Sequence, residues 1–590
     1  MNTTNVEEEF SIKSLFVPFN TTKAITFLIL IGFIVYFNSL FNGFVWDDKT
    51  YIINNVGVHT VNLVEAFKGN FFNQGGQYRP IPVVYFSILY SLFNTLPLFY
   101  HLIQISLHII NAILVFILFK TFFKRQLAFF LSLLFLLHPL QVESVSYIGA
   151  TGNNLFFLFG ISALLLAIKV QSKGKQILIA LFGLLLLSLL SKETGGLFLI
   201  MVLIYSFIYK QRKFMQYLLY SLLTIGIYFL IRLSIGQIFF EKSNLVAIAR
   251  LSFHERLLNI PSVIFYYLQN FIYPNRITVG QEWIVTHITV SNFYFPLLLE
   301  ITFFLATLLY ISYLFKTNKE KVKVLFYYCL WFFIGLFFHS QIFPLDWTVA
   351  DRWFYFPSVG LIGMLGIVLQ GIKINTKTGA YIVYGFMAII IIALSIRTIV
   401  RNSNWADAIT LYSHDTKITP SWDLENNLGY EYKYIDNQPE ALKHYLKAIE
   451  LFPFESTYLN AGIVFGNMGN HKKAIEYYFK ALNANHYPSS SHKHNINTYT
   501  SLINALLISN QTILAKKVTL DALKDYPNAP ELWGLLAIIQ QWMGEDANAL
   551  NSATKANCLK STQFTNYIYN KIINNQKIKI YPDKNVTRYL

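Results

Sequence analysis

Cysteine and charged residues are both scarce in this chain. Of its 590 residues only two are cysteines, and 13% are charged. Cys329 lies within an apolar run and Cys558 in the polar C-terminal part, so the two thiols form no disulfide framework. No HExxH or CxxC pattern occurs, and the sequence therefore gives no direct support for a bound transition metal. These absences exclude a disulfide-stabilised scaffold.

Hydrophobic residues are abundant instead, at 54% of the chain. Apolar runs of membrane length recur up to Val400, and none appears after Arg401. The first run, Ala24–Phe41, lacks a small-residue cleavage site, so we predict no cleavable signal peptide. The fold class is therefore all-α, with a polytopic helical membrane domain at 1–400 and a second domain at 401–590.

The net charge of +16 comes from basic residues in short connections between apolar runs. This pattern is typical of cytoplasmic loops rather than of nucleic-acid binding. The basic connections are 120–125, 169–175, 210–213, 316–323 and 373–377. All five face the cytoplasm only if the apolar stretches Pro80–Leu96 and Leu257–Tyr273 do not cross, and the prolines around the first stretch favour a surface helix. We then expect about 11 transmembrane helices, a cytoplasmic N-terminus and an extracytoplasmic C-terminal domain.

Five connections on the opposite face carry carboxylates and cations, mostly at helix ends. These residues are Asp47, Asp48, Arg79, His138, Glu143, Lys192, Glu193, Asp351 and Arg352. A transport pathway tends to place such groups near the membrane midplane, so this arrangement favours interfacial chemistry. Transfer of a sugar from a lipid-linked phosphate needs one carboxylate as base and cations for the leaving phosphate. Because adjacent side chains diverge, one of Asp47 and Asp48 is the base and the other a support.

Each of these residues also has a structural interpretation. Asp47–Asp48 can open a polar turn, Lys192–Glu193 can form an ion pair in a loop, and Asp351–Arg352 can be an internal salt bridge. For His138, before Pro139, we favour a helix cap over a metal ligand. The metal requirement is unknown, because a divalent cation at the Asp pair needs further carboxylates from other loops.

The C-terminal domain contains a repeat of small residues. Gly429, Ala441 and Ala448 recur 33 residues later as Gly462, Ala474 and Ala481, and weaker copies contain Ala515 with Ala522 and Ala549 with Ala556. A spacing of seven puts both alanines on one helix face, where a neighbouring helix approaches closely. This pattern matches the tetratricopeptide repeat, which stacks into an α-solenoid with a concave binding surface.

Several motifs in fixed order carry a family resemblance. They are WDD at 46–48, YRP at 78–80, HPLQVESVSY at 138–147, SKETG at 191–195, DRWFYFPSVG at 351–360 and RNSNW at 401–405. With the repeats that follow, the chain resembles the transmembrane and tetratricopeptide repeat-containing glycosyltransferases, GT-C-type enzymes similar to protein O-mannosyltransferases. The resemblance implies a polyprenyl-phosphate sugar donor and Asp47 as the catalytic base in an external loop at 42–99. It also implies donor-phosphate or site-bracing roles for Arg79, His138, Glu143, Lys192, Glu193, Asp351, Arg352 and Tyr355.

The predicted function is transfer of a monosaccharide, mannose by the family likeness, to a protein or glycan acceptor that the repeats would hold. Polysaccharide- or lipid-modifying glycosyltransferases are the alternative among enzymes, and a membrane-anchored repeat scaffold or a transporter lies outside them. The sequence assigns no cofactor, and we expect no nucleic-acid partner. Richness in Asn, Lys, Ile and Phe is typical of an AT-rich bacterial genome, which would place the protein in the inner membrane.

Overall fold

A computed structural model describes residues 19–68, 76–169, 175–238, 247–372, 376–484 and 495–578. Over these ranges the chain is helical and contains no strand, with one isolated bridge between Gln281 and Val349. The chain divides into a unit at 1–411 and a unit at 412–590. Parts of two basic connections, 170–174 and 373–375, and residues 69–75 of the predicted external loop lie outside the described residues.

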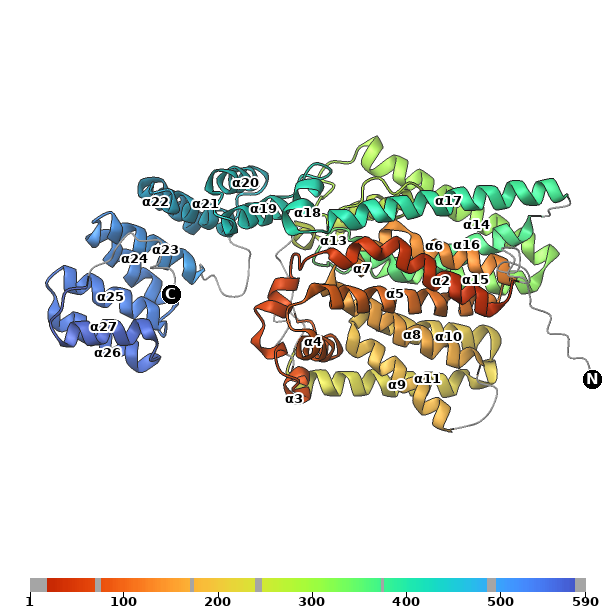
Figure 1. Ribbon diagram of the computed structural model, residues 1–590, viewed down its shortest axis with the longest axis horizontal. Coiled ribbons are helices and arrows are strands. Elements are labelled where there is room, and N and C mark those ends of the chain that lie inside the picture. The colour runs from red at the N-terminus through yellow and green to blue at the C-terminus, as the bar shows by residue number, and fades with distance from the viewer. Residues whose placement is uncertain are drawn as a thin grey trace, which may run out of the picture. The chain divides into compact units, whose positions relative to one another are not determined.

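Unit 1 consists of long apolar helices joined by short helical turns (Figure 1). Its α-helices are α2 (Thr21–Tyr36), α3 (Leu63–Phe67), α4 (Pro80–Phe93), α5 (Pro97–Lys120), α6 (Arg125–Leu137), α7 (Val142–Ser146), α8 (Thr151–Lys169), α9 (Lys175–Ser191), α10 (Gly196–Tyr209), α11 (Gln211–Leu230), α12 (Ala247–Arg250), α13 (Phe253–Ile272), α14 (Phe295–Thr317), α15 (Lys319–Phe337), α16 (Tyr355–Gly371) and α17 (Lys377–Asn404). The turns that matter for the site are η1 (Phe37–Phe41), η2 (Lys49–Ile53), η5 (Pro139–Gln141), η6 (Ile148–Ala150), η7 (Glu193–Gly195) and η10 (Asp351–Phe354).

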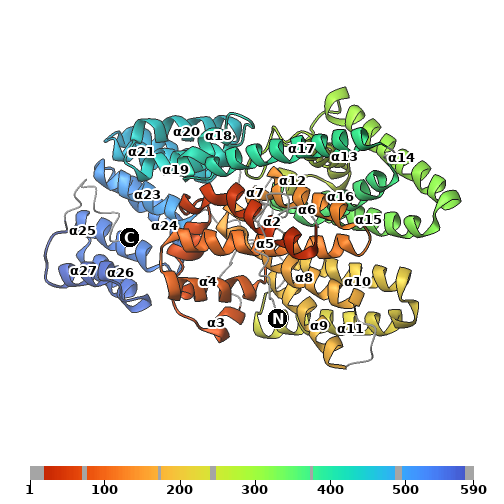
Figure 2. The same cartoon turned by 45° about the vertical axis from the view of Figure 1, so that its right-hand side comes forward.

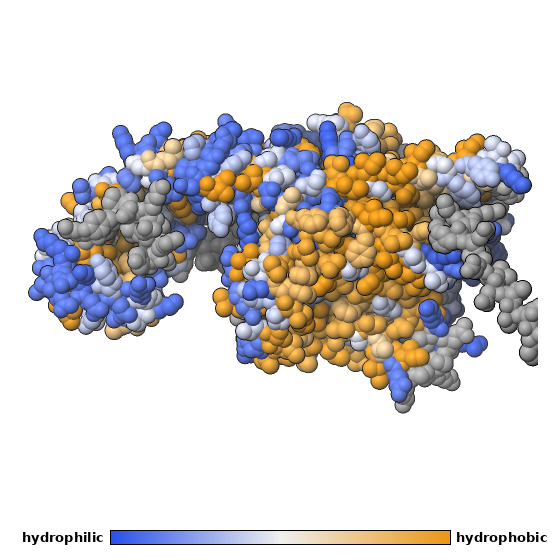
Figure 3. All heavy atoms as spheres, viewed as in Figure 1, coloured by the Kyte–Doolittle hydropathy of each residue, from blue (hydrophilic) through white to orange (hydrophobic). Residues whose placement is uncertain are grey.

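Within the described ranges, seven helices are long and apolar enough to cross a membrane, or eight if the bent pair Arg125–Leu137 and Pro139–Ser146 is one span. The apolar surface that such helices need is visible on unit 1 in Figure 3, while unit 2 is mostly hydrophilic. The predicted all-α membrane class is thereby confirmed, and the chain is a multi-pass membrane protein.

The expected count of about 11 requires three further helices to cross. α9 and α10 are apolar but short, and α15 begins with Lys319–Lys323, a charged first turn. The two stretches expected not to cross are α4, which has 14 residues, and α13, which buries Asn259 and Asn270 and is not among the candidate spans. Proline begins α4 and α5 because the first turn of a helix needs no N–H from that residue.

The helices of unit 1 pack as a bundle. α2 contacts α5, α6 and α17, while α8 contacts α5, α9 and α10, and both groups are visible in Figures 1 and 2. The predicted external connections meet at one end of this bundle. Hydrogen bonds join Asp47 to Tyr147, Arg79 to Glu193, and Arg352 to Glu143.

Unit 2 is a succession of helix pairs, as the repeat predicts. In its described part the helices are α19 (Trp422–Tyr434), α20 (Gln438–Leu451), α21 (Glu455–Asn467), α22 (His471–Asn483), α23 (Ile496–Ile508), α24 (Thr512–Asp525), α25 (Pro530–Trp542), α26 (Asp546–Leu559) and α27 (Gln563–Ile573), while α18 (Ala408–Asp415) crosses the unit boundary. Ala441, Ala448, Ala474 and Ala481 are fully buried. A Cβ at Gly462 would lie 2.6 Å from the Tyr478 ring, so a side chain there would force this ring to shift.

Candidate active site

Asp47 and Asp48 lie in the turn that follows α2 and η1. Trp46 has a left-handed backbone conformation, with φ +52°, and turns the chain just before the two carboxylates. The Asp48 side chain is fully buried, and its oxygens accept hydrogen bonds from the backbone N–H of Val45 (3.1 Å) and Gly149 (2.6 Å). Burial raises the pKa of Asp48 to about 8, against the lowering effect of these bonds. Asp48 thus ties the turn to η6 and is closed to a substrate.

Asp47 is only partly buried. Its Oδ2 accepts a hydrogen bond from the Tyr147 hydroxyl at 3.2 Å. Burial raises the pKa of Asp47, while the hydroxyls of Tyr147 and Tyr51 and the positive charge of Arg352 lower it. Of the two adjacent carboxylates, Asp47 is therefore the less enclosed.

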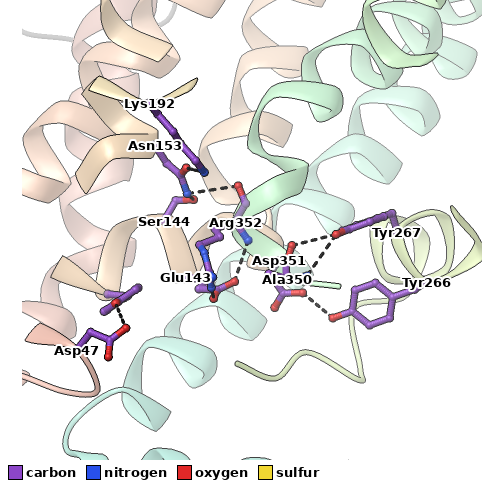
Figure 4. Close-up of polar contacts among 11 residues, drawn as sticks. Asp47, Glu143, Ser144, Asn153, Lys192, Tyr266, Tyr267, Ala350, Asp351 and Arg352 are labelled. Carbon is purple, nitrogen blue, oxygen red and sulfur yellow. Dashed lines mark hydrogen bonds and ion pairs between the residues drawn. The ribbon is translucent and has the colours of Figure 1, made fainter. Parts of the chain in front are cut away.

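Arg352 is fixed beside Asp47 by Glu143 (Figure 4). Glu143 projects from α7 and is buried; it accepts the backbone N–H of Arg352 at 2.8 Å and forms an ion pair with its guanidinium. The guanidinium also lies 5.5 Å from the centroid of the Trp46 ring. Because a guanidinium has five N–H donors, Arg352 keeps donors for a ligand while it is held by Glu143.

Lys192 reaches the same region from the connection between α9 and η7. Its ammonium donates to the side-chain oxygen of Asn153, and Asn153 in turn donates to Ser144 (3.2 Å) and to the backbone oxygen of Arg352 (3.4 Å), as Figure 4 shows. Burial, together with the positive charges of Arg79 and Arg352, holds the pKa of Lys192 well below its usual range. An anion bound here would offset that mutual repulsion.

Arg79 and Glu193 join two further connections. The Arg79 Nε donates to Glu193 at 3.0 Å, and the backbone N–H of Tyr78 donates to the other carboxylate oxygen at 3.1 Å. The buried Arg232 guanidinium lies 4.0 Å from the same carboxylate. Glu193 therefore holds two arginines, and one of them, Arg79, is close enough to Lys192 for its charge to lower the Lys192 pKa.

The side chains of three predicted site residues form hydrogen bonds elsewhere in unit 1 instead. The fully buried Asp351 accepts a hydrogen bond from Tyr266 at 2.6 Å, on the side of Arg352 away from Asp47 (Figure 4). His138 caps η5 by accepting the backbone N–H of Leu140, and its Nε2 contacts the backbone oxygen of Phe271 at 2.9 Å. The Tyr355 hydroxyl bonds to His108 (2.8 Å) and Asn111 (3.1 Å) inside the bundle.

The chain is similar to known proteins in both of its units. A family model described as a tetratricopeptide repeat matches residues 455–485. The chain is 25% identical to the human Protein O-mannosyl-transferase TMTC3 over 90% of its own length and 67% of that protein. It is 23% identical to the mouse TMTC3, over 76% of this chain and 54% of that protein. The Caenorhabditis elegans Protein O-mannosyl-transferase F38B6.6 is 24% identical, over 72% and 62%.

The resemblance inferred from the motifs is confirmed. The chain is similar to these proteins along most of its length and spans 54% to 67% of the length of the curated relatives. A tetratricopeptide region follows the membrane unit.

Sequence reasoning did not single out Tyr147, Trp46, Tyr51 or Asn153 as site residues. Trp46 and Tyr147 are part of the WDD and HPLQVESVSY motifs, and this is the only feature of the sequence that could have identified them as site residues. The roles of these four residues depend on contacts with segments that are distant in the sequence. Among the residues that the structure describes, no group of three or more His, Cys, Asp or Glu side chains is placed to hold a metal ion.

Proposed function

We propose that this protein is a glycosyltransferase that moves a monosaccharide, mannose, from a polyprenyl-phosphate carrier to a hydroxyl group of a protein acceptor. The names of its relatives support the transfer of mannose to proteins. The observation that carries the proposal is the partly exposed Asp47 carboxylate in a region that also contains the basic side chains of Arg352, Lys192 and Arg79.

In this proposal Asp47 is the general base. It takes the proton of the acceptor hydroxyl as the oxygen attacks the anomeric carbon, and the bond from that carbon to the phosphate oxygen breaks. A single displacement of this kind inverts the anomeric centre. Charge develops on the departing phosphate, where Arg352 and Lys192 stabilise it, and Glu143 and Glu193 keep the arginines oriented. Asp48 supports the turn that presents Asp47.

The position of the site at one end of the bundle suits a carrier whose tail lies in the bilayer. We extend the proposal to the orientation inferred from the loop charges, with the site and the repeats extracytoplasmic and, for a bacterial source, in the inner membrane. The tetratricopeptide helices would hold the acceptor protein.

A transfer assay tests the proposal. The full-length protein in liposomes receives undecaprenyl-phosphate mannose labelled in the sugar, with envelope proteins from cells that lack this protein as acceptors. We expect label in protein, and a loss of about 10²- to 10⁴-fold for Asp47→Asn, the usual contribution of a general base.

Asp407→Asn is the matched control, because Asp407 caps the start of α18 through Thr410 and lies outside the site. Equal transfer by wild type and Asp47→Asn would overturn the base assignment and favour a scaffold. Sugar-phosphate flux across the liposome without transfer would favour a transporter.

A further inference from the structure

Two indoles stack on Tyr147. The Trp46 ring lies 5.0 Å from the Tyr147 ring at an interplanar angle of 27°, and the Trp405 ring lies 5.9 Å away at 22°. We call Trp46, Tyr147 and Trp405 the aromatic clamp. Trp405 is fully buried, and the Arg401 guanidinium lies 5.6 Å from its ring. The three rings come from the turn after η1, the segment after α7 and the end of α17, so the clamp joins three distant parts of unit 1.

The hydroxyl end of Tyr147 is confined as well. A Cβ at Gly149 would lie 2.6 Å from the Tyr147 Oη and Cζ, so the backbone of η6 runs directly against the phenol. With its ring stacked on two indoles and its tip against Gly149, Tyr147 has little freedom to turn. Its hydroxyl donates to Asp47 Oδ2.

We propose that Tyr147 is a positioning residue for Asp47, and that Trp46 and Trp405 fix the phenol which aims the carboxylate at the acceptor hydroxyl. The inference rests on the proposed function. A phenol has one proton to donate, so one oxygen of Asp47 is held by Tyr147 while lone pairs of the other stay open to a substrate. Rigid support of this kind keeps a base within the narrow geometry that proton transfer needs.

The same bond predicts a pH effect. The groups that face Asp47 are Tyr147, Tyr51 and Arg352, with Asp48 adjacent in the chain. A hydrogen bond to the ionised carboxylate favours that form, so loss of the Tyr147 hydroxyl raises the pKa of Asp47. Because the base acts when deprotonated, the acid limb of the transfer rate then moves to higher pH.

The conservative variant Tyr147→Phe tests this, since phenylalanine keeps the stacked ring and removes only the hydroxyl. In the mannose-transfer assay we expect the acid limb to move to higher pH, with the rate on that limb falling up to about tenfold, the loss of one hydrogen bond to a charged group. Trp405→Leu should move the limb in the same direction, and Trp405→Phe should restore it.

Trp331→Leu is the control for removing a buried indole. Trp331 is also fully buried and stacked, on Phe356 at 5.0 Å, but it belongs to the bundle core. It should lower stability and leave the position of the acid limb unchanged. An unmoved limb in Tyr147→Phe overturns the inference, even when wild type transfers mannose as proposed.

A second measurement does not depend on transfer. A water-soluble carbodiimide modifies protonated carboxyl groups, and mass spectrometry of the Asp47 peptide reports its labelling against pH. The midpoint should rise in Tyr147→Phe. A wild type that labels in this way but transfers no sugar would sink the proposed function alone, whereas equal midpoints in the two proteins would sink the positioning role.

Discussion

The roles assigned to the two adjacent aspartates predict opposite outcomes for the same substitution. Asp48 is fully buried, and both of its oxygens accept backbone N–H groups, from Val45 and Gly149. In Asp48→Asn one oxygen becomes an NH₂ group that faces a backbone N–H, so this N–H loses its acceptor and the new NH₂ group has none there. Each buried unsatisfied donor costs about 1–3 kcal/mol. At pH 5 the buried Asp48 keeps its proton, so the substitution exchanges one neutral group for another, and we expect a net loss of about 2–3 kcal/mol in the free energy of unfolding.

This loss should depend on pH with a definite sign. Burial raises the pKa of Asp48 from 3.8 to about 8 in the folded protein. Between these values the folded chain retains a proton that the unfolded chain has released, so the Asp48 contribution to stability falls as pH rises through the window. The amide of the variant does not titrate. The stability difference between wild type and Asp48→Asn should therefore be larger at pH 5 than at pH 8.

Thermal unfolding of the full-length protein in detergent, followed by tryptophan fluorescence at one scan rate, measures both effects. Asp47→Asn is the matched control. The partly exposed Asp47 carboxylate is held by the Tyr147 hydroxyl rather than by backbone N–H groups, so this substitution should change the unfolding temperature little. Equal destabilisation by the two substitutions would refute the division of roles. A stability difference between wild type and Asp48→Asn that is larger at pH 8 than at pH 5 would refute the argument from burial.

Two further predictions concern stability. Glu143→Gln leaves the Arg352 guanidinium without its charged partner and should cost roughly 3 kcal/mol and reduce mannose transfer; unchanged unfolding would show that the pair is not needed. In unit 2, Gly462→Ala drives a methyl group into Tyr478 and should cost about 1–3 kcal/mol, whereas Gly466→Ala, whose Cβ would lie 3.9 Å from its nearest neighbours, should stabilise the same helix by up to about 1 kcal/mol. Equal shifts of the unfolding temperature would contradict this packing.

Much of the architecture could be predicted because it depends on patterns within single segments. Apolar runs identify helices that can cross a membrane, and alanines seven residues apart identify the helix pairs of unit 2. The meeting of polar connections also follows from the sequence, because loop charge sorts connections to the two ends of a bundle. The bonds of Arg79 to Glu193 and of Arg352 to Glu143 have this origin.

The direction of each polar side chain could not be predicted in the same way. Asp351 and Arg352 are adjacent, yet the first bonds to Tyr266 and the second to Glu143. Adjacent side chains diverge, so membership of a motif places a residue near a site but does not show whether its side chain is directed toward that site. Tyr355, three residues further along, begins α16 and points to His108 in the bundle. The divergence of adjacent side chains did predict different roles for Asp47 and Asp48. Only the hydrogen bonds from backbone N–H groups to Asp48 show that Asp48 is the enclosed carboxylate.

The aromatic clamp marks the limit of sequence reasoning most clearly. In a chain with 53 Phe and 38 Tyr, an aromatic residue near a membrane segment carries almost no information, because lipid-facing packing uses the same residues. What distinguishes Tyr147 is its contact with Trp46, about a hundred residues before it, and with Trp405, more than two hundred after it. Functional carboxylates can be found from the sequence, because burying a carboxylate is costly and needs a reason. The rings that support them can be found only from the fold, because burying an aromatic ring is favourable throughout the protein. For this reason the residues that aim a base are harder to predict than the base itself.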